Sequence, residues 1–410
     1  MQGDTAMTAK RFWQRPVFVL AFATLAIAVT YGSRQGFGMF MRPITMELGW
    51  GRETLSIAIA IQVLIYGLAA PFVGAIADKW GPIKVLVAAG SLYSFGLVMM
   101  ANSVTVEGMV FSIGLLTGLG SSGCALPLIL SIVGRVAPEE KRSTWLGITV
   151  SGGTAGQMLI VPLTQGIISS WGWVVAVLVL ACLVALVIPL AGAISSAAAG
   201  ALDRKDTQSL GEVLREARRH MGFWMLVTGF FVCGFQVQFI NAHLPAYLGD
   251  SELGENMGAI AIALIGLFNM FGTWISGWLG GRYRKKYLLS GIYFGRSLVV
   301  IGFISVPLTT ASVVIFAAFI GLLWLATVPL TSGIVVQMFG PRYLATLYGM
   351  VFLSHQLGSF AGVWMGGRIF DQTGSYGPVW YAIIAAGFVA ALMHWPINDQ
   401  PLAKPAPQAG

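Results

Sequence analysis

Long apolar runs alternate with short polar segments along the whole chain, and each run has the length of a membrane span. A helix needs about 20 mostly apolar residues to cross the hydrocarbon core of a bilayer, where it satisfies its own backbone hydrogen bonds. Twelve runs qualify, at 17–40, 54–77, 83–101, 108–134, 143–169, 172–194, 222–248, 256–280, 287–306, 309–336, 342–367 and 377–396. The pattern predicts an all-α membrane protein with twelve transmembrane helices.

The longest polar stretch lies between the sixth and seventh runs and divides the chain into two halves. We expect an N-terminal six-helix bundle at 1–194, a cytoplasmic linker at 195–221 and a C-terminal six-helix bundle at 222–410. Gly74–Lys79 ends the second run and is similar to Gly277–Arg282, which ends the eighth. Either the halves are a pseudo-symmetric repeat, or any glycine-rich helix end before a basic loop looks alike. Repeated halves are typical of transporters with a midplane substrate site.

The composition favours the same class. Hydrophobic residues make up 56% of the chain and charged residues only 10%, against about 25% charged in soluble domains. The net charge of +8 comes mostly from Lys and Arg in loops that the positive-inside rule assigns to the cytoplasm. This charge therefore predicts cytoplasmic termini and indicates no nucleic-acid partner. We expect a monomer in the inner (plasma) membrane of a bacterium, in contact with membrane lipids.

Several kinds of chemistry are missing from the sequence. Cys124, Cys182 and Cys233 all lie in apolar runs, so they form neither a disulfide framework nor a metal motif. No Walker sequence is present, and no acidic residue falls inside a predicted span, so an acid–base pair cannot be assembled there. We therefore expect no cofactor, no metal site and no enzymatic activity, and a gradient rather than ATP as the energy source.

The segment Gly74–Lys84 resembles the loop signature of the major facilitator superfamily. Its glycines permit a tight reversal, and its basic residues suit a cytoplasmic surface. In that family the loop latches the two halves together in one state of a rocking cycle. The resemblance thus implies the major facilitator fold and a conformational gating role for a set of matched residues, namely Gly74, Asp78, Lys79, Gly81 and Lys84.

Three further segments resemble the monocarboxylate porter branch of that superfamily and its bacterial relatives. They are Tyr31–Phe40 at the end of the first span, Gly147–Gly156 followed by Pro162 in the fifth, and Phe370–Tyr376 before the last. The branch implies transport, typically symport, of a monocarboxylate. Two departures matter. Thr273 stands where the branch commonly carries an Arg that anchors the carboxylate, and the acidic, Trp-containing opening of the branch's first span is not evident here.

Four ionisable residues lie at span depth, where a charge costs at least about 2.5 kcal/mol on insertion scales and is a functional candidate by default. Arg34 lies in the first span without an acidic neighbour, so it either binds a substrate anion or extends its head to the interface. Arg296 is held in reserve, because it also suits packing against carbonyls. His243 and His355 are candidates for proton coupling, or else are hydrogen-bonded packing residues.

Uncharged polar side chains complete the expected substrate pocket. They need buried partners, and they concentrate in spans that we expect to surround a passage. Besides Arg34, the set is Tyr31, Gln62, Tyr66, Gln157, Gln236, Asn241, Asn269, Tyr348 and Gln356. The leading hypothesis is a secondary transporter of a small organic anion, with a monocarboxylate as substrate, working by alternating access. The alternative is an exporter or carrier of an amphipathic aromatic compound, since Phe and Trp are abundant.

Overall fold

The computed structural model describes residues 16–136, 142–194, 210–339 and 344–400, and its secondary structure there is helical. The helices of the N-terminal half are α1 (Pro16–Gln35), η2 (Gly36–Phe40), α2 (Met41–Leu48), α3 (Arg52–Trp80), α4 (Pro82–Ala101), α5 (Val106–Met109), η3 (Val110–Thr117), α6 (Gly118–Gly123), α7 (Leu126–Val136), α8 (Arg142–Ala185) and α9 (Val187–Ile194). Those that follow are α10 (Leu210–Arg219), α11 (Met221–Gly249), α12 (Glu255–Gly280), α13 (Lys285–Ile304), α14 (Thr310–Leu323), α15 (Thr327–Phe339), α16 (Leu344–Thr373) and α17 (Gly377–His394).

Each of the twelve predicted spans corresponds to a helical segment. Ten stretches of the described chain are long and apolar enough to cross a membrane. One of them, Gly147–Ile194, contains most of the fifth predicted span and all of the sixth, and Gly172 takes a φ of +82° within α8 where the two spans meet. The predicted eleventh span is α16, with 30 residues, which is not among the ten. Residues 195–209 of the predicted linker lie outside the described residues, and α10 follows them.

Two spans are interrupted, and at one of the breaks side chains supply partners for the exposed backbone. The fourth consists of α5, the π-helical η3, α6 and α7, and the tenth is broken between α14 and α15. At the second break, Asn269 Oδ1 accepts a hydrogen bond from the Leu325 backbone N–H at 3.1 Å, and Ser276 Oγ donates to the Ala326 carbonyl at 2.8 Å. A broken helix is tolerated at membrane depth because such partners replace the missing backbone bonds.

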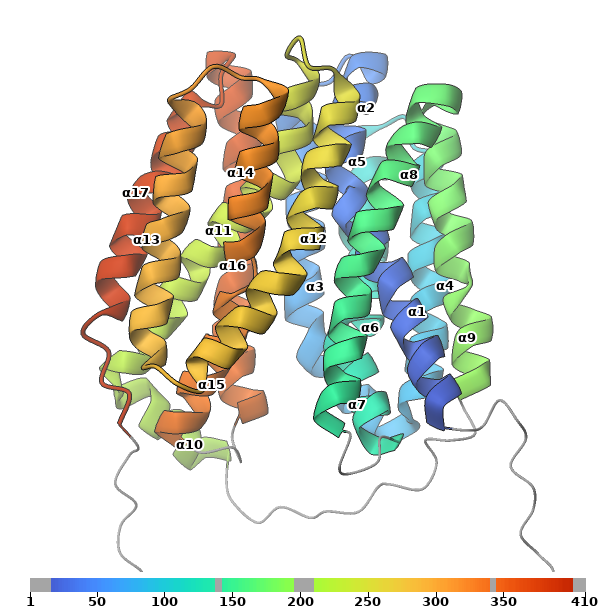
Figure 1. Cartoon of the computed structure of the whole chain (residues 1–410). Coiled ribbons are helices and arrows are strands. Elements are labelled where there is room, and N and C mark those ends of the chain that lie inside the picture. Colours follow the sequence, from blue (N-terminus) through green and yellow to red (C-terminus); the bar gives the residue numbers. More distant parts are fainter. Residues whose placement is uncertain (1–15, 137–141, 195–209, 340–343, 401–410) are drawn as a thin grey trace, which may run out of the picture.

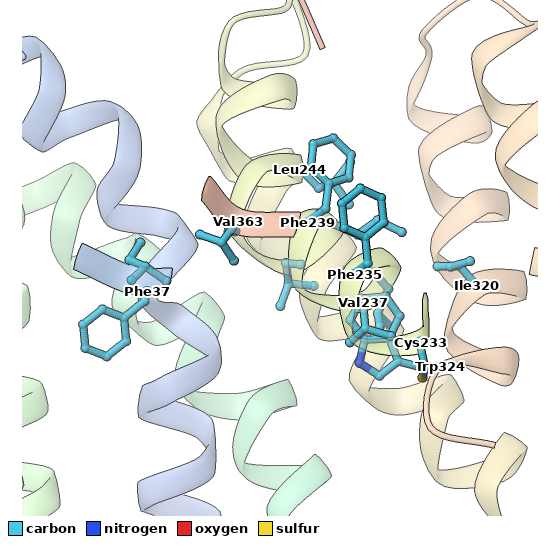
Figure 2. Packing of buried hydrophobic residues seen from close by; sticks show 14 of the residues in the cluster. Phe37, Cys233, Phe235, Val237, Phe239, Leu244, Ile320, Trp324 and Val363 are labelled. Atoms are coloured by element: carbon cyan, nitrogen blue, oxygen red, sulfur yellow. The ribbon is translucent and has the colours of Figure 1, made fainter. Parts of the chain in front are cut away.

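The two halves lie side by side, and their buried apolar contact is concentrated at one end. One buried cluster joins them, and it contains Phe37 from η2 together with Phe239 from α11 and Val363 from α16 (Figure 2). A second cluster, around Val19 of α1 and Val187 of α9, belongs to the N-terminal half alone. The ribbons of the halves meet near α2 and stand apart near α7 and α15 (Figure 1). We call the end near α2, predicted to face outward, the outer end.

Close packing between α1 and α8 depends on glycine at 156. A Cβ atom added there would overlap the backbone carbonyl of Ala28. We expect Gly156→Ala to destabilise the protein by about 1–3 kcal/mol, since overpacking forces backbone shifts. Gly147→Ala is the control on the same helix, because a Cβ there meets no atom within 4 Å. Thermal unfolding of both variants in one detergent checks this, and equal stability of the two would contradict it.

Candidate functional site

Arg34 lies at the end of α1, and its guanidinium faces aromatic rings. The Arg34 Cζ atom lies 4.5 Å from the centre of the Tyr66 ring of α3 and 5.6 Å from that of Tyr31. Arg34 is half-buried, and within the described part of the chain no acidic residue forms an ion pair with it. The N–H donors of a guanidinium lie in its own plane, so contact of its face with a ring leaves them available for a planar anion. The structure therefore brings Arg34, Tyr31 and Tyr66 together.

An aromatic row leads from Tyr66 into the C-terminal half. The Tyr66 ring meets Phe352 of α16 edge-on, with 6.3 Å between ring centres. Phe352 lies parallel to the imidazole of His355 at 5.8 Å, and His355 contacts Phe230 of α11 at 4.9 Å. Tyr348, also of α16, contacts the other side of this row through Phe230 at 6.1 Å. The row connects the two halves at the level of Arg34.

Three amide side chains meet where α1, α8 and α11 come together. Gln35 Nε2 donates to Gln157 Oε1 and to Asn241 Oδ1, both at 3.4 Å. Gln157 Nε2 also donates to the Ile262 carbonyl of α12 at 3.0 Å, so this cluster ties the halves together. Gln35 was not predicted as a site residue. Its signal was available, since it is an amide beside Arg34 inside an apolar run.

A second polar contact between the halves runs from α16 to α3. Gln356 Nε2 donates to the Val63 carbonyl at 3.1 Å, and its Oε1 lies 2.9 Å from His355 Nδ1. His355 Nδ1 is also 3.3 Å from Ser359 Oγ. His355 and Gln356 thus lie at the interface of the halves, one ring away from Tyr66.

Three other predicted pocket residues make their hydrogen bonds within one half. Gln62 Nε2 donates to Thr117 Oγ1 at 2.8 Å, and Gln236 Nε2 donates to the Ile383 carbonyl at 2.9 Å. The Asn269 oxygen accepts at the break of the tenth span, described above. Within the described residues, none of these three amides has a hydrogen bond to Arg34 or to the opposite half.

Arg296 is fully enclosed in the C-terminal half. It is 1% exposed, and Nε donates to the Leu323 carbonyl at 2.9 Å. Its Nη2 also donates to the carbonyls of Leu323 and Trp324, and Nη1 lies 3.3 Å from Cys233 Sγ. Those carbonyls belong to the end of α14, where helix geometry leaves acceptors unpaired and the dipole favours a cation. Arg296 therefore stabilises the break between α14 and α15.

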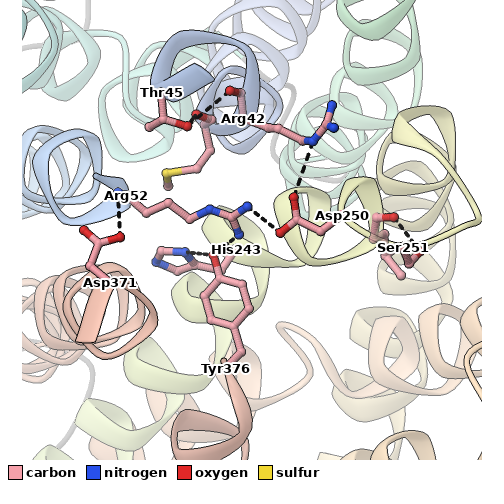
Figure 3. Close-up of polar contacts among 10 residues, drawn as sticks. Arg42, Thr45, Arg52, His243, Asp250, Ser251, Asp371 and Tyr376 are labelled. Carbon is pink, nitrogen blue, oxygen red and sulfur yellow. Dashed lines mark hydrogen bonds and ion pairs between the residues drawn. The ribbon is translucent and has the colours of Figure 1, made fainter. Parts of the chain in front are cut away.

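Charged residues at the outer end join the two halves (Figure 3). Asp250, at the end of α11, forms ion pairs with Arg52 Nη2 and with Arg42 Nε, the latter at 3.4 Å. Arg52 Nη1 donates to the Tyr376 hydroxyl at 2.9 Å, and Arg52 Cζ lies 3.9 Å from the centre of the Phe370 ring. We call Arg42, Arg52, Asp250 and Tyr376 the outer latch. Burial raises the pKa of Tyr376 to about 12, so its hydroxyl stays protonated at neutral pH.

Acids next to the outer latch hold the start of α3. Asp371 Oδ1 accepts from the Arg52 backbone N–H at 2.9 Å, and Oδ2 accepts from that of Glu53 at 2.7 Å. Glu53 in turn accepts from Trp364 Nε1 at 3.1 Å and pairs with Arg368 at 3.5 Å. A carboxylate at a helix N-terminus satisfies unpaired N–H groups and complements the helix dipole. Here the capping residue comes from the opposite half.

A family model described as Major Facilitator Superfamily matches residues 23–363. The chain belongs to this superfamily. It is 25% identical to the uncharacterized MFS-type transporter YcxA of Bacillus subtilis, over 94% of this chain and 96% of that protein. It is 24% identical to monocarboxylate transporter 11 of Homo sapiens, over 88% and 78% of the two chains. It is also 25% identical to the oxalate:formate antiporter of Oxalobacter formigenes, over 87% and 85%.

Solved structures confirm the predicted fold of this superfamily member. A bacterial homolog of the human lysosomal transporter Spinster, in an inward-facing and unoccupied conformation, matches with a TM-score of 0.73. The match covers 97% of this chain and all of that one, at 16% identity. The fold is therefore the twelve-helix, two-bundle fold of the superfamily. The fold and the relatives are those of multi-pass membrane transporters, not of enzymes.

The superfamily loop motif lies at the opposite end from the outer latch. α3 continues to Trp80, beyond the predicted end of the second span, and Gly81 ends it with a φ of +94°. That conformation favours glycine, as the tight reversal requires. Gly74 lies within α3, and Lys84 is exposed in the first turn of α4. The predicted roles of Asp78 and Lys79 depend on side chains outside the described residues.

The outer latch is the part of this transporter that the sequence analysis missed. The sequence predicted no partners for Arg42, Arg52 or Arg368, and it left His243 as either a proton-coupling candidate or a hydrogen-bonded packing residue. The available signal was that few cations lie at the outer end of the predicted spans. In the structure each of these cations pairs with an acid from another helical segment. Because Arg52 and Asp250 are far apart in the chain, their pairing became visible only in the fold.

Proposed function

We propose that this superfamily member is a secondary active transporter of a small organic anion, with a monocarboxylate as substrate. The observation that carries the proposal is Arg34, a half-buried guanidinium over Tyr66 that has no ion pair in the described ranges. A charge at that depth needs a counterion, and a carboxylate accepts two parallel hydrogen bonds from a guanidinium. The transported anion would supply the missing negative charge.

The neighbouring residues suit a small polar ligand. Tyr31 and Tyr66 flank the guanidinium, and the cluster of Gln35, Gln157 and Asn241 lies just beyond it on α1, α8 and α11. Amide and phenol groups can donate to a second oxygen of the anion, such as a hydroxyl or keto oxygen. In this proposal Arg34 takes the role of the carboxylate-binding arginine that the branch commonly carries in the eighth span, where this chain has Thr273.

The arrangement of the halves supports alternating access. The outer latch and the shared apolar cluster hold the outer end closed, while the ribbons stand apart near α7 and α15 (Figure 1). We infer that this is the inward-facing state and that the halves 1–194 and 222–410 rock about the site. The printed names of relatives, a monocarboxylate transporter and an oxalate:formate antiporter, support an organic anion. We expect a monomer in the inner membrane, cytoplasmic termini and gradient-driven symport.

The aromatic row favours one alternative, a carrier of an amphipathic aromatic compound. Tyr66, Phe352 and His355 present consecutive rings across the interface of the halves. A flat ligand could stack there, because offset and edge-on ring pairs are favourable. Binding of such a ligand would rest on ring contacts and would not need the charge of Arg34.

Transport by the purified protein in lipid vesicles tests the two proposals. We expect saturable uptake of labelled lactate or pyruvate that unlabelled carboxylates inhibit and that lactamide, the matched neutral amide, does not. The matched pair isolates the negative charge, since lactate and lactamide have nearly the same size and shape. Inhibition by neutral aromatic compounds, with none by carboxylates, would overturn the anion proposal and favour the aromatic one.

A further inference from the structure

The imidazole of His243 in α11 lies next to the Tyr376 hydroxyl of the outer latch (Figure 3). It is fully buried, and both ring nitrogens have partners. Nε2 lies 2.8 Å from the Val363 carbonyl of α16, and Nδ1 lies 3.0 Å from the Tyr376 hydroxyl. A hydrogen-bonded chain therefore runs from Asp250 through Arg52 and Tyr376 to His243.

The direction of each hydrogen bond in this chain follows from the groups themselves. A carbonyl only accepts, so Nε2 of His243 carries the hydrogen, and Nδ1 of the neutral ring is an acceptor. The Tyr376 hydroxyl donates its hydrogen to Nδ1 and accepts one from Arg52 Nη1. Every donor and acceptor of the chain is satisfied with a neutral imidazole. The closed outer end therefore fits one protonation state of His243.

A proton on Nδ1 would break this arrangement. The Tyr376 oxygen would then face two donors, Nδ1–H and Arg52 Nη1–H, and its own hydrogen would have no acceptor in the chain. The two cations would lie on either side of one hydroxyl, in a buried site where like charges repel strongly. Leaving a buried donor unpaired adds a further cost. A charged imidazole is thus incompatible with the latch as it stands.

No acid compensates for that charge within the described residues around the ring. The ring contacts Val363 and the Gly366 position of α16, Tyr376 before α17 and Phe239 on its own helix. The acids of this region contact other groups: Asp250 pairs with Arg42 and Arg52, and Asp371 caps α3. Glu53 and Arg368 pair with each other. The nearest charged side chain in the chain of contacts is Arg52, which is positive.

We propose that His243 is a proton-operated switch of the outer latch: the outer end closes only over a neutral imidazole, and protonation of His243 releases Tyr376 and Arg52 and holds the outer end open. An acidic exterior would therefore shift the carrier towards the state that is open to the outside. A shift of this kind needs only a difference in proton affinity between the two states. The inference rests on the outward orientation given under the proposed function, but not on the identity of the substrate.

Thiol labelling at the closed interface tests the switch without a substrate. Ser56 of α3 is fully buried and faces Gly367 of α16, so Ser56→Cys reports opening of the outer end. The background replaces Cys124, Cys182 and Cys233 with serine. An impermeant maleimide is added to right-side-out vesicles at about pH 7.5 and about pH 5.5, the range over which histidine changes charge. Glu252→Cys, an exposed position on the same face, corrects for the pH dependence of thiol chemistry.

The corrected labelling rate is expected to rise at least about threefold at the lower pH, as the open state becomes more populated. In His243→Gln the rate should stay low at both pH values, because an amide can donate to Val363 and accept from Tyr376 but takes no proton. Tyr376→Phe should raise the rate at pH 7.5 and blunt the response. His394→Gln, a buried histidine of α17 bonded to the Ala390 carbonyl, should respond like the parent.

Four results would overturn the proposal. They are an unchanged rate in the parent, an equal pH response in His243→Gln, an undiminished response in Tyr376→Phe, and labelling confined to inside-out vesicles. The Tyr376→Phe arm keeps the test decisive if His243→Gln does not fold. Because no substrate is added, these outcomes are independent of whether the protein transports organic anions. Failure of lactate uptake with a normal labelling response would reject the anion proposal alone.

Discussion

Replacing Arg34 with glutamine is expected to lower kcat/KM for organic-anion transport about 10- to 100-fold. A hydrogen bond to a charged group contributes about 1.5–3 kcal/mol, and each 1.36 kcal/mol corresponds to a tenfold change in rate or affinity. Glutamine keeps much of the length and polarity of the side chain but removes the positive charge that the anion requires. Initial rates of labelled lactate or pyruvate uptake into vesicles, over a range of concentrations, measure the effect.

Two comparisons make the Arg34 result specific. Arg34→Lys keeps the charge but loses the planar pair of donors, so it should lie between the parent and Arg34→Gln. Tyr66→Phe keeps the ring under the guanidinium and removes only the hydroxyl, so its effect should be smaller than that of Arg34→Gln. Full anion transport by folded Arg34→Gln protein would show that the guanidinium is not the anchor.

Replacing Arg296 with leucine is expected to cost about 3 kcal/mol of stability, the order found when buried charge-assisted hydrogen bonds are lost and acceptors are left unpaired. Arg296 donates to the carbonyls of Leu323 and Trp324 at the break between α14 and α15. Within a bilayer no water is available to replace those donors. Thermal unfolding in detergent should show a clear fall in Tm.

The control for Arg296 is a cation on the surface. Arg282 is exposed and lies over the Trp278 ring at 3.7 Å, so Arg282→Leu should change Tm much less. Arg296→Lys should recover part of the loss, because its ammonium can reach a carbonyl but not all three acceptor contacts. If Arg296→Leu is as stable as the parent, relief from burying the charge outweighs the lost hydrogen bonds, and the stabilising role is wrong.

Arg34 and Arg296 show what the position of a residue in the sequence predicts and what it does not. Both were identified from the sequence as cations inside apolar runs, since this follows from position along the chain alone. Their environments differ: Arg34 faces rings at the interface of the halves, whereas Arg296 is enclosed by carbonyls of one half. Which way a helix turns a side chain depends on the helices packed against it, so the distinction required the fold.

The amides make the same point. Gln62 and Gln356 were both expected to line a pocket, yet Gln62 bonds within its own half and Gln356 reaches the Val63 carbonyl of the other. Gln35 was overlooked although it bridges Gln157 and Asn241. Residues one or two positions apart on a helix point to different sides, so a one-residue change in helix rotation exchanges their partners.

By itself the sequence determined the membrane-spanning helices, the division into two halves and the superfamily. Those features depend on the length and apolarity of continuous segments and on a local loop motif, which need no knowledge of distant contacts. Only the tertiary structure decided which polar residues meet. Three contacts at the outer end are examples: the ion pair of Arg52 with Asp250, the cap that Asp371 gives to α3, and the hydrogen bond between His243 and Tyr376. Each joins residues that are far apart in the sequence. Such contacts are set by how the helices pack, and helix packing is a property of the whole chain.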